Sequence, residues 1–261
     1  MKILVTNDDG IEAPGLWALV GELARAGEVI VFAPSREQSG IGTAITLKQP
    51  VRLEEVEPLV AGVSAYRVEG TPADSVILGL EVTDGVDMVF SGINRGSNLG
   101  NDVLLSGTVG GALQGYLKGL PSVAISVDYS EPVHFEVAAK LAGLLAHRIR
   151  GGSMLLNVNL PNVDSASIRG LEITRVGRGG YSTAFRMGQD GAPGAYRIAL
   201  GKPDWTGGQG TDIQAVRQGK ISITPLKGTL SSARKLPALD GSLPALLREL
   251  VGGDETPLGS S

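Results

Sequence analysis

KILVTNDDGIEAPGLWALVGELARAGEVIVFAP, residues 2–34, decides the fold class of this chain. The apolar run at residues 2–6 predicts a strand. Apolar residues then recur at helical spacing from Pro14, which suits the first position of a helix, to a stop at Gly27. A second apolar run at residues 29–33 predicts another strand. This succession of strand, helix and strand is typical of a βαβ unit.

The same alternation continues to about residue 160. Further strands are predicted at residues 66–69, 86–90, 123–127 and 154–158. Further helices are predicted after an N-cap at Thr71 with Asp74 as its capping-box partner, over residues 106–120 with Ser106 as N-cap, and over residues 135–149. We therefore predict an α/β fold with a mainly parallel, Rossmann-like sheet.

Beyond residue 170 the pattern becomes β-rich. Strand-like runs cover residues 171–176 and 196–200, and residues 211–226 predict a short helix followed by a strand. Residues 177–210 have no regular pattern, and we expect an irregular arm or hairpin there that is used in oligomer contacts. We expect one α/β catalytic domain over residues 1–226 and a C-terminal extension over residues 227–261 that ends in a disordered tail.

The composition excludes several classes of function. The 27 acidic and 23 basic residues of the 261-residue chain form no block of one sign, which argues against a nucleic acid polymer as partner. No run approaches the roughly 18 apolar residues of a membrane span, and the start of the chain lacks the layout of a signal peptide. We therefore expect a cytoplasmic protein without a membrane partner. Since there is no cysteine, a bound metal must be held mainly by oxygen.

Polar clusters follow three of the predicted strands, at residues 7–9, 35–39 and 91–94. In an open parallel sheet the carboxyl ends of the strands border one crevice, where ligands bind. The first cluster contains the adjacent carboxylates of Asp8 and Asp9. They are either turn and helix-capping residues or ligands of a hard cation such as Mg²⁺ or Mn²⁺. A dinucleotide-binding turn is disfavoured, because two acids would repel a pyrophosphate.

A second feature favours the cation. The stretch SNLGNDVLLSGTVGGALQG contains Asn98 and then brings Ser106, Gly107 and Thr108 to the start of a helix, where amides, hydroxyls and the helix dipole suit an anion. An ordinary capped helix would show the same residues. Beside metal-binding carboxylates, however, they describe a site for phosphate esters, in which a metal-activated water attacks phosphorus.

Several motifs together resemble the SurE family, the survival-protein-E metal-dependent nucleotidases. They are NDDGIEAPG at 7–15, PSREQSGIGTAIT at 34–46, GTPAD at 70–74, SGINRGSNLGNDVLLSGTVGGALQG at 91–115 and TDIQAVRQGKISITPL at 211–226. The resemblance covers roughly residues 1–226 and implies a three-layer α/β/α sandwich. It also implies one divalent metal ion held by Asp8, Asp9, Ser39 and Asn94.

The activity implied by this resemblance is release of phosphate from nucleoside 5′- and 3′-monophosphates, with some action on short polyphosphate. The resemblance also implies a homodimer or homotetramer. Asp8 and Asp9 are the catalytic candidates, since either could take the proton of the attacking water, and the sequence does not distinguish them. His134 and His147 do not follow a predicted strand end, and we expect both to be structural or surface residues.

Two alternatives stay open at this stage. A haloacid-dehalogenase-type phosphatase would need an aspartate where this chain has Asn7, and an amide cannot form a phosphoenzyme. A non-catalytic module that senses nucleotides or metals would use the same crevice residues. We expect Trp17 and Trp205 to be packing or loop anchors, and Asp212 to cap the helix that it opens.

Overall fold

The structure is a computed structural model that describes residues 1–149, 151–187, 196–230, 242, 245 and 247. Residues 1–228 form one compact unit, and residues 229–261 form a second unit. The tail that we expect to be disordered, residues 252–261, lies outside the described residues. None of the described helices is both long enough and apolar enough to cross a membrane.

In the described part of the chain, nine strands form one sheet in the order β3-β4-β2-β1-β5-β6-β7-β11-β8. The strands are β1 (Lys2–Thr6), β2 (Glu28–Pro34), β3 (Leu53–Val56), β4 (Ser64–Val68), β5 (Met88–Arg95), β6 (Pro121–Val127), β7 (Met154–Leu160), β8 (Leu171–Ile173) and β11 (Ile221–Leu226). Strands β4, β2, β1, β5, β6 and β7 run parallel, whereas β3 pairs antiparallel with β4 and β11 pairs antiparallel with β7. The predicted mainly parallel sheet is confirmed.

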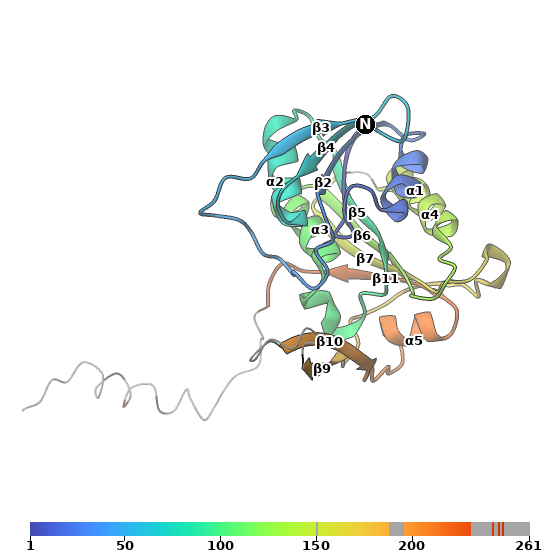
Figure 1. Cartoon of the computed structure of the whole chain (residues 1–261). Helices are drawn as coiled ribbons and strands as arrows, with labels where there is room; N and C mark the ends of the chain where they lie inside the picture. The colour runs from blue at the N-terminus through green and yellow to red at the C-terminus, as the bar shows by residue number, and fades with distance from the viewer. Residues whose placement is uncertain (150, 188–195, 231–241, 243–244, 246, 248–261) are drawn as a thin grey trace, which may run out of the picture. The chain divides into compact units, whose positions relative to one another are not determined.

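Helices cover both faces of this sheet, which gives the expected three-layer α/β/α sandwich (Figure 1). Helices α1 (Pro14–Leu23) and α4 (Phe135–Arg148) pack together on one face. Helices α2 (Pro72–Val82) and α3 (Gly107–Leu117) pack together on the other. The short helix α5 (Asp212–Arg217) precedes β11, and single 3₁₀ turns cover Gly100–Leu104 and Ser165–Ser167.

The central strand β1 supplies both halves of the core. Ile3 and Val5 belong to the cluster that packs under α1 and α4, whereas Leu4 belongs to the cluster under α2. All three side chains are completely buried. Side chains alternate between the faces of a strand, so a continuous apolar run is what a strand covered on both faces requires.

The predicted helix starts at Pro14, Thr71, Ser106 and Phe135 are confirmed, whereas the helices predicted to end at Gly27 and at residue 120 end earlier. Thr71 and Asp74 form the capping box of α2, and the Ser106 hydroxyl caps α3. Helix α1 ends at Leu23 rather than at Gly27. A Cβ atom at Gly27 would lie 2.2 Å from the carbonyl oxygen of Met1, so this glycine allows close approach to the first strand and does not cap the helix.

The strand predicted at residues 86–90 is shifted and longer in the structure. Strand β5 runs from Met88 to Arg95, and its register against β6 shifts between Ser91 and Asn94. A Cβ atom at Gly92 would lie 2.3 Å from the carbonyl oxygen of Ile125. Glycine at this point therefore lets β5 continue beside β6 and carry Asn94 to the edge of the sheet.

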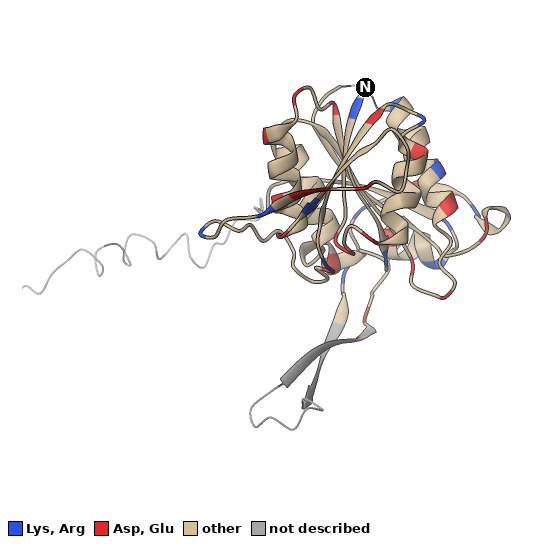
Figure 2. Ribbon diagram, turned by 45° about the horizontal axis from the view of Figure 1, so that its top comes forward, with Lys and Arg blue, Asp and Glu red and all other residues tan. Residues whose placement is uncertain are grey.

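Residues 177–210 contain a two-stranded antiparallel sheet of β9 (Tyr181–Met187) and β10 (Tyr196–Pro203). Its base is tied to the main unit through Asp102, which accepts hydrogen bonds from the Tyr181 amide and from Trp205 Nε1, each at 3.0 Å. Trp205 is therefore a loop anchor, as expected. Figure 2 shows acidic and basic residues interspersed along the described ribbon, in agreement with the charge pattern of the sequence.

Asp212 makes more contacts than the helix-capping contact that was expected. Thr211 is the N-cap of α5, and the Asp212 carboxylate is completely buried. It accepts hydrogen bonds from the amides of Gly100 at 3.0 Å and Gly177 at 2.7 Å. Its Oδ1 also accepts from the Ile213 amide at 2.8 Å, so Asp212 joins the segment before β9 to the loop after β5 and also bonds the first turn of its own helix.

Candidate functional site

The strand order reverses between β1 and β5. From β1 the chain proceeds outward to β2 and β4, whereas β5, β6 and β7 follow on the other side. Ligands of open α/β sheets bind at the carboxyl ends of the strands where the order reverses. Asp8 and Asp9 follow β1 at this point, and Asn94 and Arg95 end β5 beside them.

Asn7 shapes the turn that presents the two acids. Its Nδ2 donates to the Gly10 carbonyl at 2.9 Å, and the Gly10 amide donates to its Oδ1 at 3.2 Å. Gly10 has φ +101°, a conformation that favours glycine. Because Asn7 is completely buried and bonded within its own turn, it is structural. The position that a haloacid dehalogenase would need for its nucleophile is therefore filled by a turn-forming amide.

Asp8 is buried at the start of α3. It is 4% exposed, and its Oδ1 accepts a hydrogen bond from Thr108 Oγ1 at 2.7 Å. Burial raises the pKa of the Asp8 carboxyl group from 3.8 to about 6, against the smaller lowering effect of the Thr108 hydroxyl and amide. Helix α3 can lie this close to Asp8 because residue 107 is glycine. A Cβ atom at this position would lie 2.8 Å from Asp8 Cβ.

Asp9 lies half-buried toward β5. Its Oδ2 accepts a hydrogen bond from the Arg95 amide at 3.2 Å. Burial raises the pKa of the Asp9 carboxyl group, and Glu37 adds to this effect while Arg95 opposes it. The guanidinium of Arg95 pairs with Glu131 at 3.4 Å instead of with Asp9. In the described part of the chain, neither Asp8 nor Asp9 forms an ion pair, and for both the cost of burial is only partly offset by hydrogen bonds and by the Arg95 charge.

Ser39 and Asn94 come from the two neighbouring strand ends. The amide of Gln38, next to Ser39, donates to the Asp8 carbonyl at 2.7 Å, which brings the loop after β2 against the aspartate turn. Ser39 is exposed, and its hydroxyl donates to Glu37 at 2.7 Å. Asn94 Nδ2 donates to the Gly96 carbonyl at 2.6 Å, which leaves Asn94 Oδ1 as the atom that could coordinate a cation.

This donor set fits a hard divalent cation. It offers two carboxylates without a cationic partner, together with hydroxyl and amide oxygens, and Mg²⁺ and Mn²⁺ prefer such ligands. Within the described residues, no group of three or more His, Asp and Glu side chains is arranged to hold a metal ion. A metal at this crevice would therefore depend on Ser39 and Asn94 oxygens, or on water, beside Asp8 and Asp9.

The predicted phosphate-binding residues surround the start of α3. Ser106 Oγ accepts from the Val109 amide at 3.1 Å, so this hydroxyl caps the helix. Thr108 directs its hydroxyl to Asp8. Asn98 Nδ2 donates to Ser126 Oγ at 3.0 Å and, more weakly, to Thr108 Oγ1 at 3.4 Å. Thr108 therefore links Asn98 to Asp8, and Ser106 is bonded within its own helix.

The backbone of Asn98 is clamped by two residues that the sequence reasoning missed. Asn159 Oδ1 accepts from the Asn98 amide at 2.8 Å. Asn157 Nδ2 donates to the Asn98 carbonyl at 2.8 Å, and Asn159 Nδ2 donates to it at 3.2 Å. Both asparagines are completely buried on β7. The signal was the motif NVN, which places amides at two positions of one strand face in an otherwise apolar strand.

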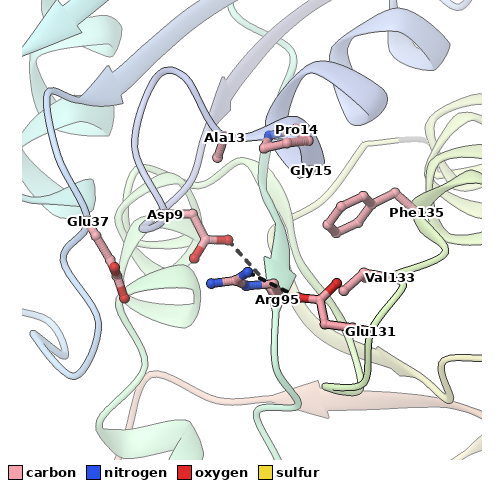
Figure 3. A pocket seen from close by; sticks show the side chains of 9 residues that line it. All are labelled: Asp9, Ala13, Pro14, Gly15, Glu37, Arg95, Glu131, Val133 and Phe135. Atoms are coloured by element: carbon pink, nitrogen blue, oxygen red, sulfur yellow. Dashed lines mark hydrogen bonds and ion pairs between the residues drawn. The ribbon is translucent and has the colours of Figure 1, made fainter.

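A pocket of about 390 Å³ lies beside Asp9 (Figure 3). It is lined by Asp9, Ala13, Pro14, Gly15, Glu37, Arg95, Glu131, Val133 and Phe135. Neither histidine lines it, which agrees with the expectation for both. His134 is exposed before α4, and His147 lines a different pocket with Met1 and Asp87.

Comparisons with known proteins agree with this architecture. The family described as survival protein SurE matches residues 3–183. The chain is 46% identical over 234 residues to a 5′-nucleotidase SurE of Dehalococcoides mccartyi, covering 87% of this chain and 88% of that protein. It is 42% identical over 251 residues to a 5′-nucleotidase SurE 1 of Thermus thermophilus, covering 93% and 98%. The crystal structure of the SurE protein from Aquifex aeolicus matches with a TM-score of 0.75 at 35% identity, over 95% of this chain and all of that one. The chain belongs to the survival protein SurE family.

Proposed function

We propose that this chain is a 5′-nucleotidase, a metal-dependent phosphomonoesterase that releases phosphate from nucleoside 5′- and 3′-monophosphates. The observation that carries the proposal is the pair Asp8 and Asp9, buried without a cationic partner where the strand order reverses and next to the start of α3. The names of the relatives in Dehalococcoides and Thermus support the same activity. Short polyphosphate is a second substrate class to be tested.

Asp8 and Asp9, with oxygens of Ser39 and Asn94, would hold one Mg²⁺ or Mn²⁺ ion. When bound, the ion would supply Lewis acidity and a water with a lowered pKa. The start of α3 favours an anion through its dipole and its first backbone amides. We expect Thr108 and Asn98 to turn from each other to phosphoryl oxygens when substrate is present. Either aspartate could take the proton of the attacking water.

The test is a phosphate-release assay on a panel of nucleoside monophosphates and tripolyphosphate with Mn²⁺ or Mg²⁺. The proposal requires turnover that stops in excess chelator and in the Asp8→Asn and Asp9→Asn variants, with circular dichroism unchanged. Full activity of both variants, or full activity in chelator, would overturn it. Nucleotide binding without turnover would indicate a sensing module instead, and a trapped phosphoaspartate would indicate a haloacid-dehalogenase mechanism.

The proposal includes a cytoplasmic homodimer or homotetramer. The β9–β10 hairpin, whose strands pair with each other and not with the main sheet in the described chain, is the segment that we expect to contribute to assembly. Light scattering coupled to size-exclusion chromatography gives the oligomeric state. Deletion of β9 and β10 should reduce the oligomeric state, whereas an unchanged mass would exclude these strands from the contact.

A further inference from the structure

The pocket beside Asp9 lies on the opposite face of the sheet from the start of α3. Its walls come from the first residues of α1 and from the segment that leads into α4, and these two helices cover one face of the sheet. Gly107 and Thr108 begin α3, which covers the other face. A phosphomonoester at the crevice with its phosphoryl group toward α3 would therefore direct its leaving group into this pocket.

The lining of the pocket suits an aromatic ring system. Phe135 and Val133 extend into it from the side of α4, and Pro14 closes it from the side of α1 (Figure 3). Phe135 is half-buried. Its ring packs against the main core, which holds it in place, and also lines the pocket. A fixed aromatic ring of this kind can stack against a nucleobase of any identity.

The charges of the pocket disfavour an anionic occupant. Asp9, Glu37 and Glu131 contribute three carboxylates, and Arg95 contributes the one cation among the lining residues. The guanidinium of Arg95 is already engaged by Glu131 at 3.4 Å and lies 5.5 Å from the centre of the Tyr129 ring. Even with a cation on Asp9, the two glutamates remain beside any group that enters. Further phosphates on a substrate would therefore meet negative charge here.

We propose that this pocket receives the uncharged nucleoside of the substrate, with Phe135 as the surface on which the base stacks and with Glu37 and Glu131 as the groups that select against polyphosphate. The proposal rests on the proposed function for its substrate class. Phe135 and the two glutamates are specificity-determining residues in this assignment and take no part in holding the metal. We expect the nucleoside to occupy the pocket for both 5′- and 3′-monophosphates, because the nucleoside part of both substrates is uncharged.

The stacking role is tested with two substrates that differ only by the base. In Phe135→Ala, KM for AMP should rise about tenfold, the size expected for loss of one base–aromatic contact, while KM for ribose 5-phosphate stays unchanged. Phe135→Leu, which keeps apolar bulk on α4, should show the same selective loss if the fold of Phe135→Ala is impaired. Equal changes for both substrates, or no change for AMP, would overturn the assignment.

The charge role is tested with Glu131→Gln. The ratio of its kcat/KM for tripolyphosphate to its kcat/KM for AMP should rise about threefold, the size expected for one exposed charge. Glu136→Gln is the matched control, because Glu136 is an exposed acid in the first turn of α4 that does not line the pocket. An equal rise in the control variant, or no rise in Glu131→Gln, would overturn this part.

Binding of adenosine, which carries no phosphate, tests the proposed pocket independently of the hydrolysis reaction. Titration calorimetry needs no turnover, so it gives a result even if no phosphate ester is hydrolysed. Adenosine should bind to the full chain, bind about tenfold more weakly to Phe135→Ala and bind normally to Glu136→Gln. Absence of phosphate release together with this pattern would refute the proposed function and keep the pocket, whereas phosphate release from AMP with equal adenosine binding in all three proteins would refute the pocket alone.

Discussion

Replacing Asp8 with Asn is expected to stabilise the metal-free protein while it abolishes phosphate release. Asp8 is 4% exposed, and burial raises the pKa of its carboxyl group from 3.8 to about 6. Above pH 6 the group is charged in both the native and the unfolded protein, so the native state carries the full cost of burying the charge. The difference between these two pKa values means that the charged Asp8 side chain lowers the free energy of unfolding by about 3 kcal/mol.

The substitution removes the charge and keeps the contact. Thr108 Oγ1 donates to Asp8 Oδ1 at 2.7 Å, and the Oδ1 atom of an asparagine can accept the same hydrogen bond. We therefore expect Asp8→Asn to raise the free energy of unfolding by about 1–3 kcal/mol near pH 7. The advantage should shrink as the pH falls from about 6 toward 4, because native Asp8 takes up a proton before unfolded Asp8 does.

Urea denaturation in excess chelator, at about pH 7 and about pH 4.5, measures the difference between the two proteins. Asp84→Asn is the control, since Asp84 is exposed and lies on the loop before β5. Adding Mn²⁺ should then raise the stability of the wild-type protein and leave Asp8→Asn almost unchanged. The reasoning is refuted if Asp8→Asn in chelator near pH 7 is no more stable than the wild type.

Three further substitutions test the surroundings of the aspartates. Asn94→Ala should weaken Mn²⁺ binding about tenfold, measured by calorimetry, with the unfolding temperature in chelator unchanged. Gly107→Ala places a Cβ atom 2.8 Å from Asp8 Cβ and should lower kcat about tenfold or more while helical circular dichroism is retained. Asn159→Ala leaves the buried Asn98 amide without its acceptor and should lower the free energy of unfolding by about 2 kcal/mol, measured in urea. Wild-type values in any of these assays would contradict the role given to that residue.

The layers of the fold could be predicted from the sequence because local signals and burial agree there. The run at Lys2–Thr6 is apolar on both faces, and the structure covers both faces of β1. The capping residues Thr71 and Ser106 lie where helices begin. Strand β3 was missed because its sequence LEEV is polar and only its partner strand β4 fixes it at the edge of the sheet.

The errors at Gly27 and at β5 have a common cause. Glycine signals a turn or a helix end in sequence, yet Gly27 and Gly92 are glycines because another part of the backbone passes close to them. The atoms concerned belong to Met1 and Ile125, and only the folded sheet brings them near. Tertiary contact of this kind leaves no trace in a local pattern.

The site could be predicted where it follows strand ends, and not where it depends on support from a distant strand. Asp8, Asp9 and Asn94 are placed by the order of β1 and β5. The clamp on Asn98 comes from β7, about sixty residues later, and contains Asn157 and Asn159. Because a buried amide in an apolar strand must be bonded, the motif NVN indicates a partner without identifying it.

The energetics of Asp8 argue for a bound cation independently of the family to which the chain belongs. A structural aspartate of this depth would be expected to meet a lysine or arginine, as buried acids without a partner are costly. Here the Arg95 guanidinium pairs with Glu131 and only partly offsets the burial of Asp9, and residue 107 is a glycine, so that α3 can approach Asp8. The fold therefore keeps a negative charge that its own residues balance only in part, at the point where three strand ends meet. We therefore expect a hard cation from solution to balance this charge, and titration of the chain with Mn²⁺ in a calorimeter, with Asp8→Asn as the comparison, tests that expectation.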